Sequence, residues 1–282
     1  MGILSGLSDL GLGRLEGADL YKKEEKQQEK ALDAKEAQAI SEKELILEKT
    51  IECPVCYKSF KESKVKTGKA RLIRQDKDLR PIYSGIDLGK YDVCSCPNCG
   101  YTAIDKWFPV IAAPQAKLIK EQISRSVRRF KRDTVISYDE ALDRYRLCLA
   151  NCIVKKGKDS EKAYTCLKMA WIVRGYAENL DTSDPEYKEK LEALKGDEDE
   201  LLHNALEGFI LARSNESSPI AGMDPVQLDY LLSVLCLNEN RLDEAGRFIM
   251  GVLQSRSASS RIKNKALDIK EEILEKKKSQ GA

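Results

Sequence analysis

Two short cysteine motifs constrain the fold of this chain more than any other feature of its sequence. Both are C-x-x-C motifs, CPVC and CPNC, and 39 residues separate them. Two residues between the cysteines let one tight turn point both sulfur atoms at one ion, and proline fixes the first φ of that turn. Four thiolates suit tetrahedral zinc, so we predict one zinc ion per chain. The predicted ligands are Cys53, Cys56, Cys96 and Cys99.

A site with four cysteine ligands has no open position for water, so this zinc is expected to be structural. The chain has a single histidine, His203, which excludes a catalytic zinc centre built on two or three histidines. Two alternatives stay open: a redox dithiol, and an iron–sulfur cluster or rubredoxin-type iron on the same ligands. Cys94 lies two residues before Cys96 and is an alternative ligand.

The remaining cysteines indicate buried thiols. The chain has nine cysteines, and an odd number without a secretory signal argues against a disulfide framework. Four of them lie in helical patterns, where a thiol packs as a small hydrophobic side chain. These are Cys148, Cys152, Cys166 and Cys236. A second metal site formed by the first three is the less favoured interpretation.

The charge is divided unevenly along the chain. Residues 51–132 carry 18 basic and 8 acidic residues, and the rest carries 30 basic and 38 acidic residues. No apolar run approaches the ~18 residues that a membrane-spanning helix needs, so no membrane insertion is expected. The N-terminus lacks a basic start followed by a long apolar stretch, which argues against a secretory signal. We therefore expect a cytoplasmic protein.

Changes in composition divide the chain into five segments. Residues 1–20 are rich in glycine and leucine and are expected to be flexible, and residues 21–50 form a charged helical or disordered spacer. Short runs of β-branched and aromatic residues, broken by glycine and proline, predict a small β domain at 51–112, like a zinc ribbon. A basic connecting helix follows at 113–134, and a helical domain at 135–282.

The helical domain resembles tetratricopeptide repeats. Leu232 and the small Ser233 precede a turn, and Ala245 follows at the spacing of the second helix of such a repeat. A similar pair surrounds Ala163, but the two alanines are 82 residues apart, which is not a multiple of the ~34-residue period. We expect an irregular repeat, with a generic helical bundle as the alternative. The predicted fold class is α+β, mostly α.

Two basic segments are candidates for contact with nucleic acid. Residues 64–80 and 115–132 are rich in lysine and arginine, and the second includes Arg125, Arg128 and Arg129. Such side chains neutralise phosphates, but they are also common on solvated helix faces. Few aromatic residues are available there to stack on bases. A nucleic-acid partner is therefore the second interpretation.

The segment between the two motifs contains a dense group of polar side chains. Asp78, Arg80 and Tyr83 could form a ligand-binding or catalytic surface, or a scaffold held by ion pairs, which we favour. The sequence has no phosphate-binding loop, dinucleotide fingerprint, nucleophile elbow or zinc-protease motif. An enzyme is the third interpretation.

Together these motifs resemble a conserved bacterial family of unknown function that is common in Clostridia. The resemblance rests on the two motifs, the opening heptapeptide and Ala170-Trp171, with further segments at 64–70, 78–86 and 90–101. It implies a zinc-ribbon-like head followed by a tetratricopeptide-like tail, in a cytosolic protein without an established activity. Cys94 departs from the family pattern, in which an apolar residue is usual at this position.

The interpretation that we favour is a non-enzymatic adaptor. The zinc unit would be a rigid head, and the helices would offer a surface to a peptide or protein partner.

Overall fold

The computed structural model of this protein describes residues 41–127 and 132–280. The flexible segment predicted at 1–20 lies outside this part, as do residues 21–40 of the predicted spacer. The spacer prediction is wrong for the last residues of its range. A short 3₁₀ helix, η3 (Glu42–Leu45), leads into strand β1 (Ile46–Glu52). This strand presents mostly charged side chains to solvent, so the sequence reads as a solvated helix although the backbone pairs with the next strand.

Six short strands form three separate two-stranded antiparallel sheets, β1–β2, β3–β4 and β5–β6. The strands after β1 are β2 (Ser59–Val65), β3 (Leu72–Gln75), β4 (Pro81–Tyr83), β5 (Val93–Ser95) and β6 (Thr102–Ile104). A 3₁₀ helix, η4 (Leu88–Tyr91), precedes β5. Isolated hairpins of this size are marginally stable in water. They therefore depend on what they pack against.

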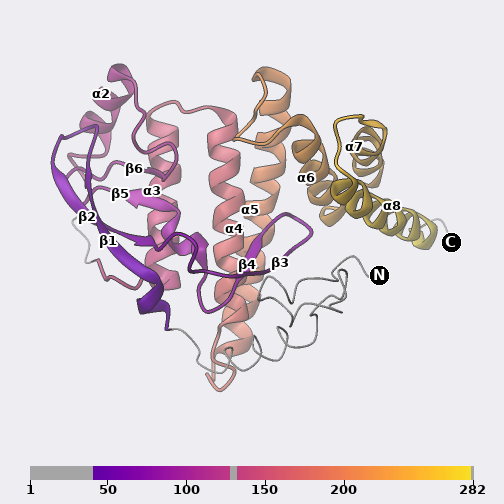
Figure 1. Ribbon diagram of the computed structural model, residues 1–282, viewed down its shortest axis with the longest axis horizontal. Helices are drawn as coiled ribbons and strands as arrows, with labels where there is room; N and C mark the ends of the chain where they lie inside the picture. Colours follow the sequence, from indigo (N-terminus) through magenta and orange to yellow (C-terminus); the bar gives the residue numbers. More distant parts are fainter. Residues whose placement is uncertain (1–40, 128–131, 281–282) are drawn as a thin grey trace, which may run out of the picture. The chain divides into compact units, whose positions relative to one another are not determined.

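Helices make up the remainder of the chain, so the predicted fold class, α+β and mostly α, is confirmed. They are α2 (Ala113–Gln122), α3 (Tyr138–Val154), α4 (Asp159–Glu178), α5 (Tyr187–Asn215), α6 (Pro225–Asn238), α7 (Leu242–Gln254) and α8 (Ser260–Gln280). From α3 onward each helix contacts the next, and α3, α4 and α5 lie side by side (Figure 1).

The basic connecting helix is shorter than predicted. Helix α2 ends at Gln122, well before residue 134. The chain then turns toward the second cysteine motif, where Ser124 Oγ donates to the carbonyl of Cys99 at 2.8 Å. Val127 packs over Gly100, where a Cβ atom would come within 2.7 Å of Val127 Cγ1. These contacts stabilise the turn in place of a continued helix.

Side-chain caps fix the start of two helices. Ser137 Oγ accepts a hydrogen bond from the Glu140 N–H at 3.1 Å and so caps α3. Asp224 caps α6 in the same way through the Gln227 N–H, and Pro225 occupies the first helical position.

The contact between α6 and α7 involves the small residues that suggested a repeat. Ser233 and Ala245 are both fully buried, and Ser233 Oγ donates to the carbonyl of Ala245 at 3.0 Å. Ile249 and Val252 are buried on the same side of α7. The two helices pack closely as a pair, whereas the tetratricopeptide repeat itself stays a prediction.

Helices α4 and α5 also approach each other through small residues. A Cβ atom on Gly208 of α5 would lie 2.8 Å from the Cβ atom of Ala163 in α4. Alanine favours a helix over glycine by about 1 kcal/mol, but overpacking a core costs about 1–3 kcal/mol. We therefore expect Gly208→Ala to destabilise the protein, as measured by urea unfolding. Gly196→Ala in the same helix is the control. Its Cβ atom would have no neighbour within 4 Å, so this change should be stabilising. Equal effects of the two changes would contradict this packing argument.

The hairpins and helices share their hydrophobic core. Tyr91 and Val93 belong to one buried cluster with Tyr145 of α3 and Ile172 of α4. From residue 41 onward the chain forms one compact unit, so no division between units falls at the predicted boundaries 112/113 or 134/135. None of the described helices combines the length and apolar character that a membrane crossing requires.

Candidate metal centre

The two C-x-x-C motifs form the turns of two β hairpins. The first connects Glu52 of β1 to Ser59 of β2, and the second connects Ser95 of β5 to Thr102 of β6. Each pair of residues is the last register pair of its hairpin. In both hairpins the cysteines therefore lie in the turn, just beyond the last pair of residues that the two strands form.

The backbone of the two turns is also alike. The N–H of Tyr57 donates to the carbonyl of Cys53 at 2.8 Å, and the N–H of Gly100 donates to the carbonyl of Cys96 at 2.9 Å. Both residues that follow the second cysteine have positive φ, 60° at Tyr57 and 72° at Gly100. Two equivalent turns thus face the same point in space.

The four sulfur atoms lie within 4.8 Å of one another. Cys53 Sγ is 3.6 Å from Cys99 Sγ, and Cys56 Sγ is 3.7 Å from Cys96 Sγ. Four sulfurs at about 2.3 Å from a tetrahedral zinc ion are about 3.8 Å apart, whereas a disulfide needs about 2.05 Å. The arrangement therefore fits one tetrahedral ion, and the donor set fits zinc.

The close approach of the sulfurs moves the pKa values of their thiols apart. Backbone N–H groups of each turn donate to a sulfur, including those of Val55 to Cys53 and Asn98 to Cys96. Hydrogen bonds from the thiols of Cys53 and Cys99 lower the pKa of Cys96 to about 2. The contact with Cys96 raises the pKa of Cys53 to about 12, and the contacts with Cys53 and Cys96 raise the pKa of Cys99. A bound cation is what would let such close sulfurs ionise together.

Cys94 lies outside the sulfur cluster. Its sulfur is fully buried and donates to Glu62 Oε2 at 3.6 Å. Burial and the nearby Glu62 carboxylate raise the pKa of the Cys94 thiol well above its usual range, which keeps it protonated. Because β strands alternate their side chains, Cys94 and Cys96 could share a face, but the turn that begins after Ser95 redirects Cys96 toward the other cysteines.

Glu62 is the centre of a buried charge network that the sequence did not indicate. Its side chain is 1% exposed and pairs with Arg144 Nη1 of α3 at 2.7 Å and with Arg132. Arg144 in turn contacts Glu140 at 2.6 Å. Glu62 lies among lysines, and the charged composition of its strand is typical of a solvent-exposed edge strand. Its local sequence therefore does not predict its burial. This network attaches the first hairpin to α3.

Asn151 of α3 connects the helices to the second turn. Its Nδ2 donates to the carbonyl of Gly100 at 3.1 Å and to the carbonyl of Leu147 at 2.8 Å. Together with the bond from Ser124 to Cys99, this contact fixes the second turn from α3 and from the segment that follows α2. The cysteine cluster therefore lies where the hairpins contact the helices.

Tyr57 is unusual in its turn because it holds a left-handed conformation with its side chain 70% exposed. A non-glycine residue in this conformation costs about 1–2 kcal/mol, and its ring contacts Lys120 at 5.5 Å. We expect Tyr57→Gly to stabilise the protein by up to about 1 kcal/mol in urea unfolding, because relief of this strain exceeds the cost of the larger chain entropy that glycine has in the unfolded state. Gly100→Ala is the opposing control and should destabilise, because its Cβ would contact Val127. A loss of stability in Tyr57→Gly would contradict this interpretation.

The predicted binding residues Asp78 and Arg80 take part in ion pairs with α4. Asp78 Oδ2 accepts from Trp171 Nε1 at 3.0 Å and from Arg174 Nη2 at 2.7 Å. Arg80 donates to both carboxylate oxygens of Glu178, at 3.0 and 2.8 Å. Both residues are buried. These contacts anchor the β3–β4 hairpin on α4, and a ligand-binding role for the segment stays a prediction.

Tyr83 lines a cavity of about 320 Å³ beside this anchor. The cavity is polar, and its charged lining residues come from η3, the segment 80–90 and α4. They are Glu42, Arg80, Asp87, Lys90 and Glu178. Lys90 pairs with Glu42 at 2.7 Å, and burial raises the pKa of Asp87, which accepts a hydrogen bond from the Gly89 N–H.

Ion pairs partly neutralise the predicted basic surface. Lys64 contacts Asp105, Arg74 contacts Asp76, and Lys77 reaches Glu272 of α8 at 2.6 Å. Arg125 is exposed after the end of α2. Arg128 and Arg129 lie outside the described residues. Binding of nucleic acid by these segments stays a prediction.

The other metal candidates are not part of a ligand cluster among the described residues. Cys148, Cys152 and Cys166 are buried in the helical core. His203 is exposed, and its Nδ1 lies 3.0 Å from Glu239 Oε1. The interpretation of these cysteines as core residues agrees with their burial.

Comparison with known families identifies the family of this chain. Residues 46–273 match the family described as "Uncharacterized protein conserved in bacteria (DUF2225)". The chain belongs to this family. The resemblance inferred from the motifs is thereby confirmed, and the match includes both cysteine turns and all helices up to most of α8. No match was found among curated proteins or among solved structures.

Proposed function

We propose that this protein is a zinc-binding, non-enzymatic adaptor of the bacterial cytoplasm. In this proposal one zinc ion on Cys53, Cys56, Cys96 and Cys99 holds the hairpins in place, and the helices contact a protein or peptide partner. One observation carries the proposal. Where the two hairpin turns meet the helices, four sulfur atoms lie at distances from one another that fit a tetrahedral ion.

A structural role for the metal follows from its ligands. Four thiolates fill the coordination sphere of zinc and leave no position for water or substrate. Cys53, Cys96 and Cys99 are buried, and Cys56 is half-buried. The second turn is fixed by hydrogen bonds from Ser124 and Asn151. Zinc would therefore stabilise the platform on which the hairpins and α3 depend.

The pairing of polar groups supports a role other than catalysis. In the cavity beside Tyr83, Glu178 is held by Arg80, and Glu42 is held by Lys90 and by the hydroxyl of Tyr91 at 2.8 Å. A general acid or base has to exchange a proton with substrate, and groups held in ion pairs are poorly suited to that task. The arrangement is better explained as a scaffold that joins η3 and the hairpins to α4.

The outer helices supply apolar surface for a partner. Met250 of α7 and Leu267 and Leu274 of α8 are exposed. Arrays of helix pairs present extended surfaces of this kind to peptides and proteins. In the adaptor proposal, the partner binds to these side chains.

The proposal is tested by purifying the tagged full-length protein from its native host, with nuclease treatment, and identifying what stays bound. We expect a specific protein to remain bound in near-stoichiometric amount. A complex that is lost after nuclease treatment, or that dissociates steeply with salt, would instead support the nucleic-acid alternative. Arg125→Glu should then weaken it, whereas the adaptor complex should be unaffected by this change.

A further inference from the structure

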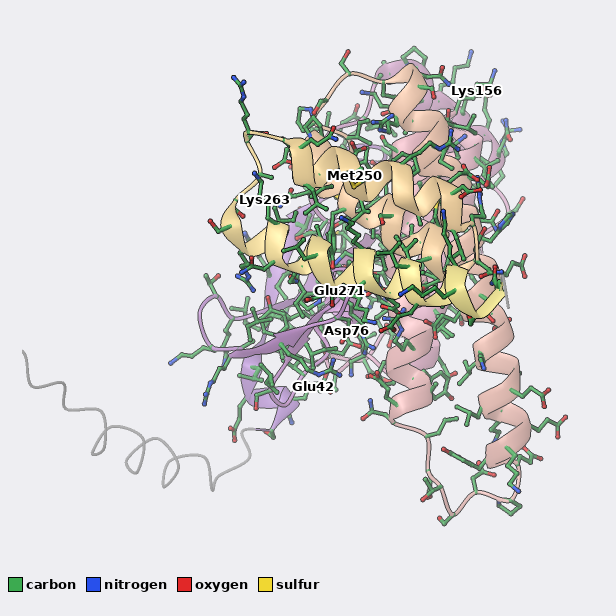
Figure 2. All side chains as sticks on the ribbon, turned by 90° about the vertical axis from the view of Figure 1, so that its right-hand side faces the viewer. Glu42, Asp76, Lys156, Met250, Lys263 and Glu271 are labelled. Carbon is green, nitrogen blue, oxygen red and sulfur yellow. The ribbon has the colours of Figure 1, made fainter. Side chains whose placement is uncertain are left out.

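The last two helices enclose a surface groove of about 600 Å³. Helices α7 and α8 pack side by side, and Met250 marks the exposed face of α7 (Figure 2). Ile249 and Ile273 are buried at the base of the groove, while the side chains of Met250 and Leu274 are 39% and 47% exposed. The groove therefore combines a closed apolar floor with flexible apolar side chains open to solvent.

The rim of the groove is basic. Arg247 of α7 and Lys270 and Lys277 of α8 line it, with Asp243 as the single acidic lining residue. Asp243 is already bound to Lys277 at 2.6 Å. Within the described residues, no side-chain hydrogen bond or ion pair engages Arg247 or Lys270. The three basic side chains exceed the one carboxylate of the lining, and Arg247 only helps to lower the pKa of Asp243 and Glu244 at a distance. A basic rim beside an apolar surface complements acidic residues beside an apolar stripe.

Gly246 provides a second, independent observation. It lies in the interior of α7 and lines the groove, where glycine is less favourable than alanine. A Cβ atom built on Gly246 would meet no atom within 4 Å. Packing within the described chain therefore does not require glycine at this position. A missing side chain instead lets the backbone of another molecule come close to the helix.

We propose that the α7–α8 groove binds an amphipathic helix with acidic residues on a partner protein. The apolar residues of the partner, spaced three and four positions apart, would pack on Met250 and Leu274. Its carboxylates would pair with Arg247 and Lys270, and Gly246 would admit its backbone. This inference rests on the proposed adaptor function and names the class of partner. The flexible thioether of Met250 suits a surface that adapts to such a helix.

The test uses the full-length protein as bait for a displayed random library of helix-forming peptides of about 16 residues, or about four turns. Peptides are selected on the unmodified protein alone, and enriched peptides are titrated against it and its variants by fluorescence anisotropy. We expect enriched peptides to combine an apolar stripe with aspartate or glutamate beside it. Affinity should fall at least about tenfold for Met250→Asp and for Gly246→Phe, which fills the groove.

A charge reversal distinguishes charge-specific recognition from nonspecific apolar binding. The double variant Arg247→Glu/Lys270→Glu should lose the acidic peptides and bind the same peptides with lysine in place of their acidic residues. Arg256→Glu, an exposed change on the segment between α7 and α8 but outside the groove lining, is the matched control and should leave affinity unchanged. Circular dichroism of each variant verifies folding, and Leu274→Asp replaces Met250→Asp if the latter unfolds.

Three results would overturn the inference: no enrichment of peptides, enriched peptides without acidic residues, or equal affinity for all variants. Self-association that Met250→Asp abolishes, measured by sedimentation, would identify a second copy as the occupant and also overturn it. These failures are distinguishable from failure of the adaptor proposal. A native partner that remains bound to the Met250→Asp variant would preserve the adaptor function and place its contact elsewhere.

Discussion

Replacing Cys53 or Cys99 by serine should remove the bound metal and unfold most of the hairpin region. Structural zinc contributes about 10 kcal/mol or more to the folding of small metal domains, which is comparable to the whole stability of a typical domain. We expect about one zinc per chain in the purified protein, measured by elemental analysis. The variants should lose this metal, and chelation of the unmodified protein should lower its Tm strongly. Elemental analysis also distinguishes zinc from iron on the same ligands.

Cys94→Ala is the matched control for this experiment. The Cys94 thiol is buried in the same region but contacts Glu62 instead of the sulfur cluster. Its replacement should leave the metal content unchanged. Loss of metal in Cys94→Ala would contradict the ligand set, and a metal-free protein whose four cysteines pair reversibly would support redox chemistry instead.

Replacing Glu62 by glutamine should destabilise the protein by about 3–5 kcal/mol, because it removes the carboxylate that Arg132 and Arg144 share and leaves Arg144 with Glu140 alone. The side chains of Glu62 and Arg144 are almost fully buried, with exposed fractions of 1% and 2%. Glutamine keeps the shape of the side chain, so the loss reports charge and hydrogen bonding instead of packing. The free energy of unfolding in urea is the measurement.

Glu48→Gln is the control on the same hairpin. Glu48 pairs with Lys61 at 3.2 Å on the solvent-exposed side of β1–β2. Exposed ion pairs contribute about 0–1 kcal/mol, so this change should be nearly neutral. Similar effects of the two glutamine variants would show that the buried pair contributes no more than the exposed one, and would contradict the network described around Glu62.

Some features followed from local sequence patterns. The C-x-x-C spacing identified the cysteines whose sulfurs lie together, because two intervening residues form one turn. The helical domain predicted at 135–282 contains α3 to α8, and it begins close to Ser137, which caps the first turn of α3. The small residues Ser233 and Ala245 indicated the α6–α7 pair, since close helix contacts require small side chains.

Other features depend on contacts between residues far apart in the chain. Strand β1 has the charged composition of a solvated helix and becomes a strand by pairing with β2 from Ile46 to Glu52. Helix α2 ends at Gln122 because the following residues bind the second turn. Burial of Glu62 depends on Arg144, which lies 82 positions away. Local composition carries no information about such partners.

The sequence alone therefore determined the cysteine turns, the helical segments and the family, because each depends on residues close together in the chain. Tertiary structure decided how these parts meet. It separated Cys94 from the four clustered sulfurs, buried Glu62 between two arginines, and engaged Asp78 and Arg80 with α4. It also left Gly246 and Met250 facing an open groove. The physical reason is that burial and charge pairing depend on neighbours in space, which local spacing does not specify.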